Sequence, residues 1–230
     1  MHQLWVSISE AFNLLFHLDR ELAVLIGTSF HVSVISTFIA SIIALPMGVC
    51  FGLAEFRGRR FLDAVFNTTL FLPTVVIGLL VYMFLTRNGP FGHYSLLFTK
   101  TAIIIGQFFL ALPIIFTMVS NSVRIADKRI LMTALTLGVG RFRSYIALLG
   151  EVRGLVLLAI IAGFGRVIAE IGVAMMLGGN IYGKTRTITT GIALLTSRGE
   201  FSKAIALGIV LLVVVFGVNL VIYAVTHREK

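Results

Sequence analysis

The chain has 230 residues, of which 58% are hydrophobic and 13% are charged, about half the charged share of an ordinary soluble domain. This composition excludes a soluble globular protein and predicts that residues 1–230 form a single membrane domain. The net charge of +9 is typical of the basic loops that membrane proteins keep in the cytoplasm. It does not indicate nucleic-acid binding, because no basic run alternates with exposed aromatic residues as such binding requires.

Residues 3–18 predict an amphipathic helix at the N-terminus. Its apolar face comprises Leu4, Trp5, Ile8, Ala11, Phe12, Leu15 and Phe16, which repeat at helical spacing. The opposite face is too polar for a membrane span, so we expect this helix to lie flat at the membrane interface. The alternative for the same residues is a poorly ordered terminus.

Five apolar segments are long enough to cross a bilayer, which takes about 20 helical residues. They are residues 22–53, 61–85, 101–123, 154–177 and 204–226. Pro46, Pro73 and Pro113 each fall inside one of these segments, where a proline removes a backbone donor and kinks the helix. The sequence therefore predicts an all-α integral membrane protein with about five transmembrane helices.

The loops between these segments differ in charge. Eleven of the 19 lysines and arginines follow the first, third and fifth segments, and seven lie on the other side. Because basic loops stay in the cytoplasm, we expect the N-terminus outside the cell and the C-terminus in the cytoplasm. The one basic residue that belongs to neither set is Arg166, which lies within the fourth segment.

The longest cytoplasmic loop, residues 125–153, is predicted to carry two short helices. Asp127 can cap a first helix over residues 128–137, which the glycines that follow would end. A second helix covers residues 141–149 and ends at a further glycine. We expect a compact projection whose small residues, Ala134 and Gly138, admit a partner closely. An ordinary helical hairpin is the alternative.

Arg166 and Glu170 lie one helical turn apart inside the fourth apolar segment. Charges within a membrane span cost several kcal/mol unless they face a protein interior or water. The pair therefore indicates a polar element at depth, which a mere membrane anchor does not need. A glycine-rich turn at residues 178–180 and a basic, threonine-rich loop are predicted to follow.

A resemblance to the EAA loop of ABC importer permeases rests on residues 134–138, Ala-Leu-Thr-Leu-Gly, ahead of a basic-aromatic segment. In that family the loop is a coupling helix that sits in a cleft of the ATPase subunit. The positions that match its Glu-Ala-Ala…Gly pattern are Met132, Thr133, Ala134 and Gly138. The resemblance implies ATPase coupling through these residues and Arg141. The chain departs from the pattern at Met132, where the family has Glu, and at residues 150–151, where it usually has Leu-Pro.

Further stretches resemble the branch of these permeases that handles molybdate, sulfate and tungstate. They are Phe164-Gly165-Arg166, Glu170-Ile171-Gly172 and Met176-Leu177-Gly178-Gly179-Asn180-Ile181. The threonine-rich residues 185–190 and the stretch 196–201 look most like the tungstate-type permease. The resemblance covers residues 25–225, nearly the whole chain.

The resemblance implies a permease subunit in the cell (inner) membrane that moves an oxyanion, tungstate first, into the cytoplasm by ATP-driven alternating access. Its implied partners are a second copy in a homodimer, two cytoplasmic ATPase subunits, an external substrate-binding protein and membrane lipid. The chain holds no Gly-x4-Gly-Lys-Ser/Thr phosphate loop, so we expect ATP hydrolysis in a separate subunit and no enzyme activity here.

Candidate residues for a translocation path or gate are Arg166, Glu170, Thr74 and Asn121. The alternatives are a structural ion pair for the two charges and helix-to-helix hydrogen bonds for the polar pair. No metal or other cofactor is expected, since no His, Asp and Glu cluster has ligand spacing and Cys50 is the only cysteine. The alternative functions are a permease for molybdate, sulfate or another small solute, and a stand-alone secondary transporter or channel.

Overall fold

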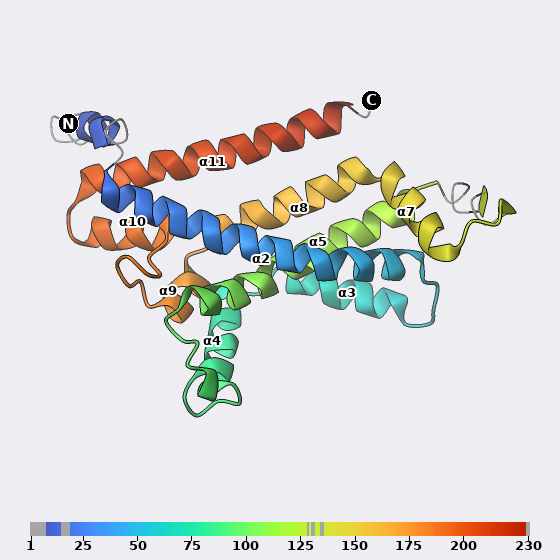
Figure 1. The fold of residues 1–230 in the computed structure, drawn as a ribbon, viewed down its shortest axis with the longest axis horizontal. Coiled ribbons are helices and arrows are strands. Elements are labelled where there is room, and N and C mark those ends of the chain that lie inside the picture. Colours follow the sequence, from blue (N-terminus) through green and yellow to red (C-terminus); the bar gives the residue numbers. More distant parts are fainter. Residues whose placement is uncertain (1–7, 15–18, 128, 130–131, 134–135, 229–230) are drawn as a thin grey trace.

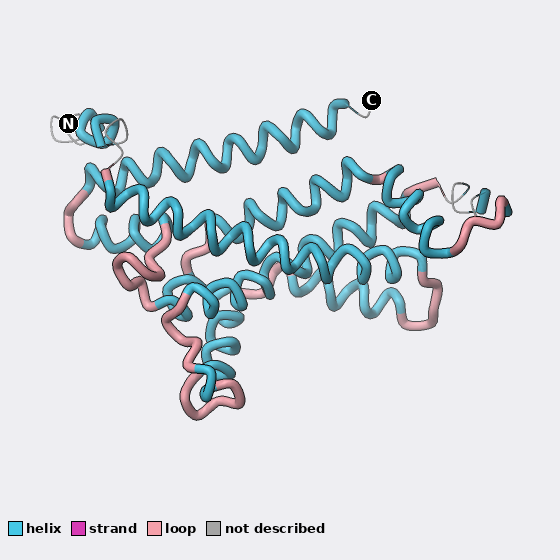
Figure 2. The backbone as a smooth tube through the Cα atoms, viewed as in Figure 1, coloured by secondary structure: helices cyan, strands magenta, loops and turns pink. Residues whose placement is uncertain are grey.

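The computed structural model describes residues 8–14, 19–127, 129, 132–133 and 136–228. These residues form helices joined by loops and turns, with no strand among them, so the all-α prediction is confirmed (Figure 2). The elements in chain order are α2 (Arg20–Leu53), α3 (Arg59–Thr69), α4 (Thr74–Leu85), the 3-10 turn η1 (Gly92–Tyr94), α5 (Lys100–Ile125), α7 (Arg141–Glu151), α8 (Arg153–Ile168), α9 (Gly172–Gly178), α10 (Ile188–Ser197) and α11 (Phe201–Arg228).

The long helices α2, α5, α8 and α11 lie side by side along the long axis of the molecule (Figure 1). Of these, α2, α5 and α11 are each long and apolar enough to cross a membrane as one helix. They confirm the first, third and fifth predicted spans. Pro46 and Pro113 lie inside α2 and α5, which continue through them.

The second predicted span is broken. Residues 61–85 form parts of α3 and α4, two helices that meet at 94° and together are long and apolar enough for one broken span, bent far more sharply than a kinked helix. Pro73 stands directly before α4, and a proline disfavours helical backbone at the residue that precedes it. No residue of α3 is buried, so packing does not hold the chain straight here as it does around Pro46 and Pro113. As a result α4 leaves the bundle and points away from it (Figure 1).

The fourth predicted span is also divided. The axis of α8 is bent by 76° from that of α7, and α8 ends at Ile168, before the separate helix α9. The expectation of one helix over residues 154–177 is therefore wrong. The basic, threonine-rich segment predicted as a loop is a loop over residues 181–187, and it leads into α10, whose first residues are buried. Such breaks inside a membrane protein persist only where other groups satisfy the freed amides and carbonyls.

The core of the molecule is the contact between α2 and α5, where small residues bring the two backbones together. A Cβ added at Gly48 would come within 2.9 Å of Val119 Cγ1, and one at Gly52 within 2.9 Å of Val123 Cβ. Small residues at such positions let membrane helices pack closely, and packing is what drives their association. By contrast, only 11% of the residues in the apolar stretch of α11 are buried, so this helix lies on the outside of the bundle.

The bundle has two different ends (Figure 1). One, which we call the α7 end, holds the α2–α3 loop, the described residues between α5 and α7, and α7 itself. The other, the α10 end, holds the beginning of α2, the helix α10 and the turn between α10 and α11. The two basic loops predicted to share the cytoplasmic side thus lie at the same end of the molecule.

Within the predicted N-terminal helix the structure describes residues 8–14, which are helical. Ala11 is fully buried and belongs to the same apolar cluster as residues of α10 and α11. Glu10 Oε2 accepts a hydrogen bond from Ser202 Oγ at 2.7 Å. The rest of that prediction lies outside the described residues, and its place at a membrane interface stays a prediction.

Candidate functional site

The break between α8 and α9 is built around the carboxylate of Glu170. Arg166 Nη1 donates to Glu170 Oε2 at 2.8 Å, so the pair predicted from the four-residue spacing forms. The other carboxylate oxygen, Oε1, accepts from the backbone amides of Gly172 at 2.8 Å and Val173 at 3.3 Å. Those amides open α9 and have no partner within the helix, so Glu170 acts as a cap for α9.

The two members of this pair have unequal surroundings. The side chain of Glu170 is 4% exposed, whereas that of Arg166 is 38% exposed. The carboxylate is held by backbone donors as well as by the arginine. Among the described residues, Arg166 makes one hydrogen bond through its side chain, to Glu170. The arginine therefore keeps guanidinium donors at an accessible surface, while the glutamate is enclosed.

Three other helices hold the same break. The hydroxyl of Thr189, on α10, donates to the backbone oxygen of Glu170 at 2.8 Å. Gln107 on α5 donates through Nε2 to the Val167 oxygen at 3.1 Å, and its own Oε1 accepts from Ser36 Oγ on α2 at 3.1 Å. Backbone carbonyls at the end of α8 are thus satisfied from α5 and α10, and α2 orients the Gln107 side chain that provides one of these bonds.

The structure brings three of the four path candidates together and leaves the fourth apart. A Cβ built on Gly172 would lie 3.2 Å from both Thr74 Oγ1 and Glu170 Oε1, so the start of α4 adjoins the Arg166–Glu170 pair. Asn121 is exposed, one turn before the end of α5 and about 20 Å along that helix from Gln107. Its role in a path stays a prediction that rests on its residue type.

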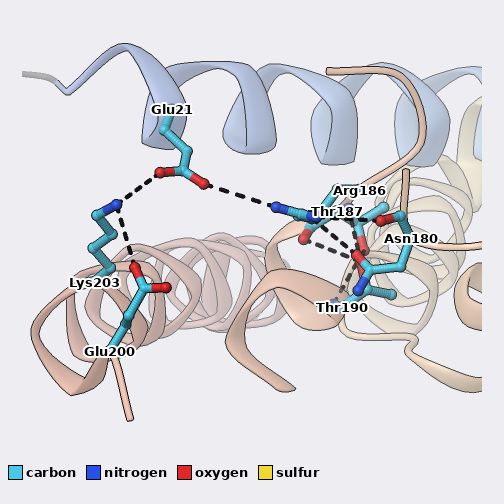
Figure 3. Close-up of polar contacts among 7 residues, drawn as sticks. All are labelled: Glu21, Asn180, Arg186, Thr187, Thr190, Glu200 and Lys203. Carbon is cyan, nitrogen blue, oxygen red and sulfur yellow. Dashed lines mark hydrogen bonds and ion pairs between the residues drawn. The ribbon is translucent and has the colours of Figure 1, made fainter. Parts of the chain in front are cut away.

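A second polar cluster, at the α10 end, was not predicted from the sequence (Figure 3). Glu21 on α2 accepts from Lys203 Nζ at 2.9 Å and lies 3.8 Å from Arg186 Nη1. Arg186 Nε donates to Asn180 Oδ1 at 3.2 Å, and its guanidinium lies over the ring of Tyr182. The side chain of Arg186 is only 10% exposed. The cluster holds three segments together, namely α2, α11 and the loop that precedes α10.

The predicted basic, threonine-rich loop ends at Thr187, which is the N-cap of α10. The side chains of Thr187 and Thr190 each bond to the other's backbone amide in a capping box, and Ser29 of α2 accepts from the Ile188 amide at 2.6 Å. These bonds satisfy amides that would otherwise be buried without a partner. The sequence signal for this cap is the pair of threonines three residues apart, Thr187 and Thr190.

The coupling candidates lie at the α7 end, where the chain projects from the bundle (Figure 1). Met132 and Thr133 are helical and exposed, and Gly138 is exposed with φ of +76°, a conformation that favours glycine. The predicted cap is present, since Asp127 Oδ1 accepts from the Arg129 amide at 2.9 Å. Two predictions fall outside what the structure describes: Ala134, and the side chain of Arg141, whose backbone begins α7.

Arg59 closes the α7 end of α2. Its guanidinium donates to the carbonyls of Ala54 and Gly52, the second at 3.0 Å, where the helix leaves acceptors free and favours a positive charge. Asp63 on α3 pairs with Arg124 on α5 at 3.2 Å and thereby links these two helices. Among the described residues, no three His, Cys, Asp or Glu side chains gather as metal ligands would.

Comparison with known proteins places this geometry in context. The family model described as binding-protein-dependent transport system inner membrane component matches residues 22–230. The tungstate uptake system permease protein TupB of Peptoclostridium acidaminophilum is 37% identical over 218 residues, covering 95% of this chain and 96% of that protein. TupB of Campylobacter jejuni is 38% identical over 96% of this chain and 91% of its own length. The molybdenum transport system permease protein ModB of Escherichia coli K12 is 28% identical over 72% of this chain and 79% of its own.

Proposed function

Because the chain belongs to the family of binding-protein-dependent transport system inner membrane components, we propose that it is the permease of an ABC importer that carries tungstate into the cytoplasm. The choice of tungstate as the substrate rests on the sequence identity of 37–38% with two tungstate uptake permeases, over more than nine-tenths of each chain. Similarity to the molybdenum permease is lower and covers less of the chain. Transport is the subunit's task, and ATP hydrolysis belongs to a separate partner.

The proposed assembly follows from the two ends of the bundle. The α7 end faces the cytoplasm, because the basic loops gather there. Two ATPase subunits dock on the coupling segment, which we define as residues 132–138. An external substrate-binding protein delivers the anion at the α10 end. Two copies of the chain form the path between them, since closed two-fold symmetry is the commonest arrangement for a homo-oligomer.

The bend between α7 and α8 supports a mechanism of alternating access. ATP-driven closure of the ATPase subunits moves the coupling segment, which two residues, Val139 and Gly140, join to α7. Because α7 and α8 meet at Val152 with an angle of 76°, a tilt of α7 is passed on to α8. The far end of α8 carries Arg166 and leads into Glu170, so motion at the α7 end reaches the polar break. A rigid-body tilt of this kind is a common form of transport transition.

Reconstitution tests the proposal. The permease, the ATPase and the binding protein from the same organism are placed in liposomes, and uptake of tungstate, molybdate and sulfate is measured with and without ATP. ATP-dependent uptake of tungstate in preference to the other two supports it. A preference for molybdate or sulfate would make that anion the substrate in place of tungstate. Anion uptake without the ATPase would indicate a secondary transporter or channel. Reporters fused after residue 230 and within residues 88–94 test the orientation, the first expected inside and the second outside.

A further inference from the structure

We propose that Arg166 contacts the translocated oxyanion directly and that Glu170 receives the guanidinium again when the anion has left. This inference rests on the proposed transport of an oxyanion and assigns one residue of the path. It also divides the roles of the pair: Glu170 organises the break between α8 and α9, and Arg166 meets the substrate.

The depth of Arg166 determines what its exposed part faces. A helix rises about 1.5 Å per residue, which places Arg166 about 20 Å along α8 from the charged residue Arg153. The hydrocarbon core of a bilayer is about 30 Å thick. A charged side chain that is 38% exposed at such a depth is unfavourable against lipid, so its accessible surface must face water or protein. A water-filled path between two copies of the chain satisfies this condition.

The hydrogen bonds of the pair leave the arginine available. Glu170 has two backbone amides on Oε1 and is enclosed, so α9 stays capped when the arginine turns away. Arg166 contacts the carboxylate through Nη1, and its planar guanidinium carries further N–H donors. Guanidinium groups bind tetrahedral oxyanions through two parallel hydrogen bonds, a geometry that a lysine cannot reproduce.

Glu170 also limits how tightly the anion is held. The pair is neutral as a whole, so a dianion that meets Arg166 also meets the negative charge beside it. Passage through a narrow path requires binding that is favourable enough for the ion to arrive and weak enough for it to leave. An unpaired arginine would retain a dianion for longer. The hydroxyl of Thr74 lies next to Gly172 and adds a neutral polar group near the pair.

The test is the number of tungstate ions imported per ATP hydrolysed by the reconstituted importer. In Arg166→Gln the ratio should fall by about tenfold, the effect expected from the loss of one charge-assisted contact, while the ATPase rate stays near that of the wild type. Arg166→Lys should lie between the two, because it keeps the charge and loses the paired geometry. Arg124→Gln is the matched control: it removes an arginine that is 46% exposed and paired with Asp63, and its ratio should not change.

A second variant keeps the test decisive if Arg166→Gln folds poorly. In Arg166→Gln/Glu170→Gln no buried charge is left unpaired, and the amide oxygen of the glutamine that replaces Glu170 can still accept from the α9 amides. A low ratio in this double variant supports the proposal, whereas a ratio equal to that of the wild type overturns it and leaves a structural pair. A wild type that imports none of the three oxyanions instead overturns the proposed function, so the two failures are distinguishable.

Discussion

The α10 end and the α7 end of the bundle are stabilised in different ways. At the α10 end, side chains from separate segments converge, and Glu21 and Asn180 lie beside the guanidinium of Arg186 (Figure 3). The ring of Tyr182 covers the same guanidinium, and the Arg186 side chain is only 10% exposed. At the α7 end, the bonds of the described coupling segment are local, with Thr136 Oγ1 and Leu137 N both donating to the Thr133 oxygen. The α10 end is fastened across helices, whereas the described residues of the coupling segment bond mainly to one another.

In the proposed mechanism the cross-linked α10 end stays in place and the coupling segment moves. An importer that works by alternating access needs both, because a tilt has an effect only relative to something that stays in place. The helix α8 joins them: it leaves α7 at one end and enters the break at Glu170 at the other. The exposed Arg166 lies at this border, and Arg186 does not, although both are arginines paired with glutamates.

The largest effect is expected at the α7 end. Gly138→Trp should lower ATP-driven uptake by about 100-fold or more, because an indole in the coupling segment removes about 3 kcal/mol of docking to the ATPase. Gly58→Trp is the matched control, since Gly58 also has positive φ and open space around it at the same end. It should leave uptake near normal. Co-purification of the Gly138 variant with the ATPase at wild-type yield, together with normal uptake, would contradict the prediction.

The next effect concerns the border between the two regions. Arg166→Met leaves the enclosed carboxylate of Glu170 without its counter-charge, which should cost about 3–5 kcal/mol and lower the yield of folded protein. The double change Arg166→Met/Glu170→Met should recover much of that loss, less about 1 kcal/mol for the missing cap of α9. Thermal unfolding of Arg166→Met, Glu170→Met and the double variant gives the coupling free energy between the two side chains. Additive losses would mean that the two side chains do not interact.

A smaller effect is expected at the fixed end. Arg186→Met should destabilise the protein by about 2 kcal/mol, because it removes the hydrogen bond to Asn180 at a largely buried site. The loss is no larger because Glu21 keeps its bond to Lys203. Lys203→Met, which removes the more exposed cation of the same cluster, should cost about 0.5 kcal/mol. Neither change should alter co-purification with the ATPase, since the cluster lies at the α10 end. Equal losses in unfolding temperature for the two variants would show that burial of Arg186 contributes nothing.

The smallest effect is expected at the start of α10. Thr187→Val removes the capping box and should cost about 1 kcal/mol of stability. Thr196→Val is the control, because this threonine is exposed near the other end of the same helix. The difference between their unfolding midpoints measures the cap. If the two midpoints agree, Ser29 alone is sufficient to hold the first turn of α10.

Local patterns in the sequence determined the features that depend on neighbouring residues. Apolar runs of α2, α5 and α11 could be assigned as spans because a helix satisfies its own backbone in a membrane. The Arg166–Glu170 pair followed from the helical repeat, and the cap at Asp127 and the turn at Gly138 followed from residue type. The resemblance to oxyanion permeases was likewise visible in short motifs, and the family match agrees with it.

The tertiary structure decided whatever depends on packing between distant segments. Three prolines look alike in the sequence, yet the chain breaks only near Pro73, because α3 lacks the buried contacts that hold α2 and α5 straight. Ser29, far away in the chain, accepts from the Ile188 amide in the first turn of α10, a contact that no local pattern shows. Glu21 and Arg186 were likewise too far apart in sequence to be paired from a pattern. Side-chain periodicity reports on one helix at a time, whereas these contacts exist only once several helices have packed together.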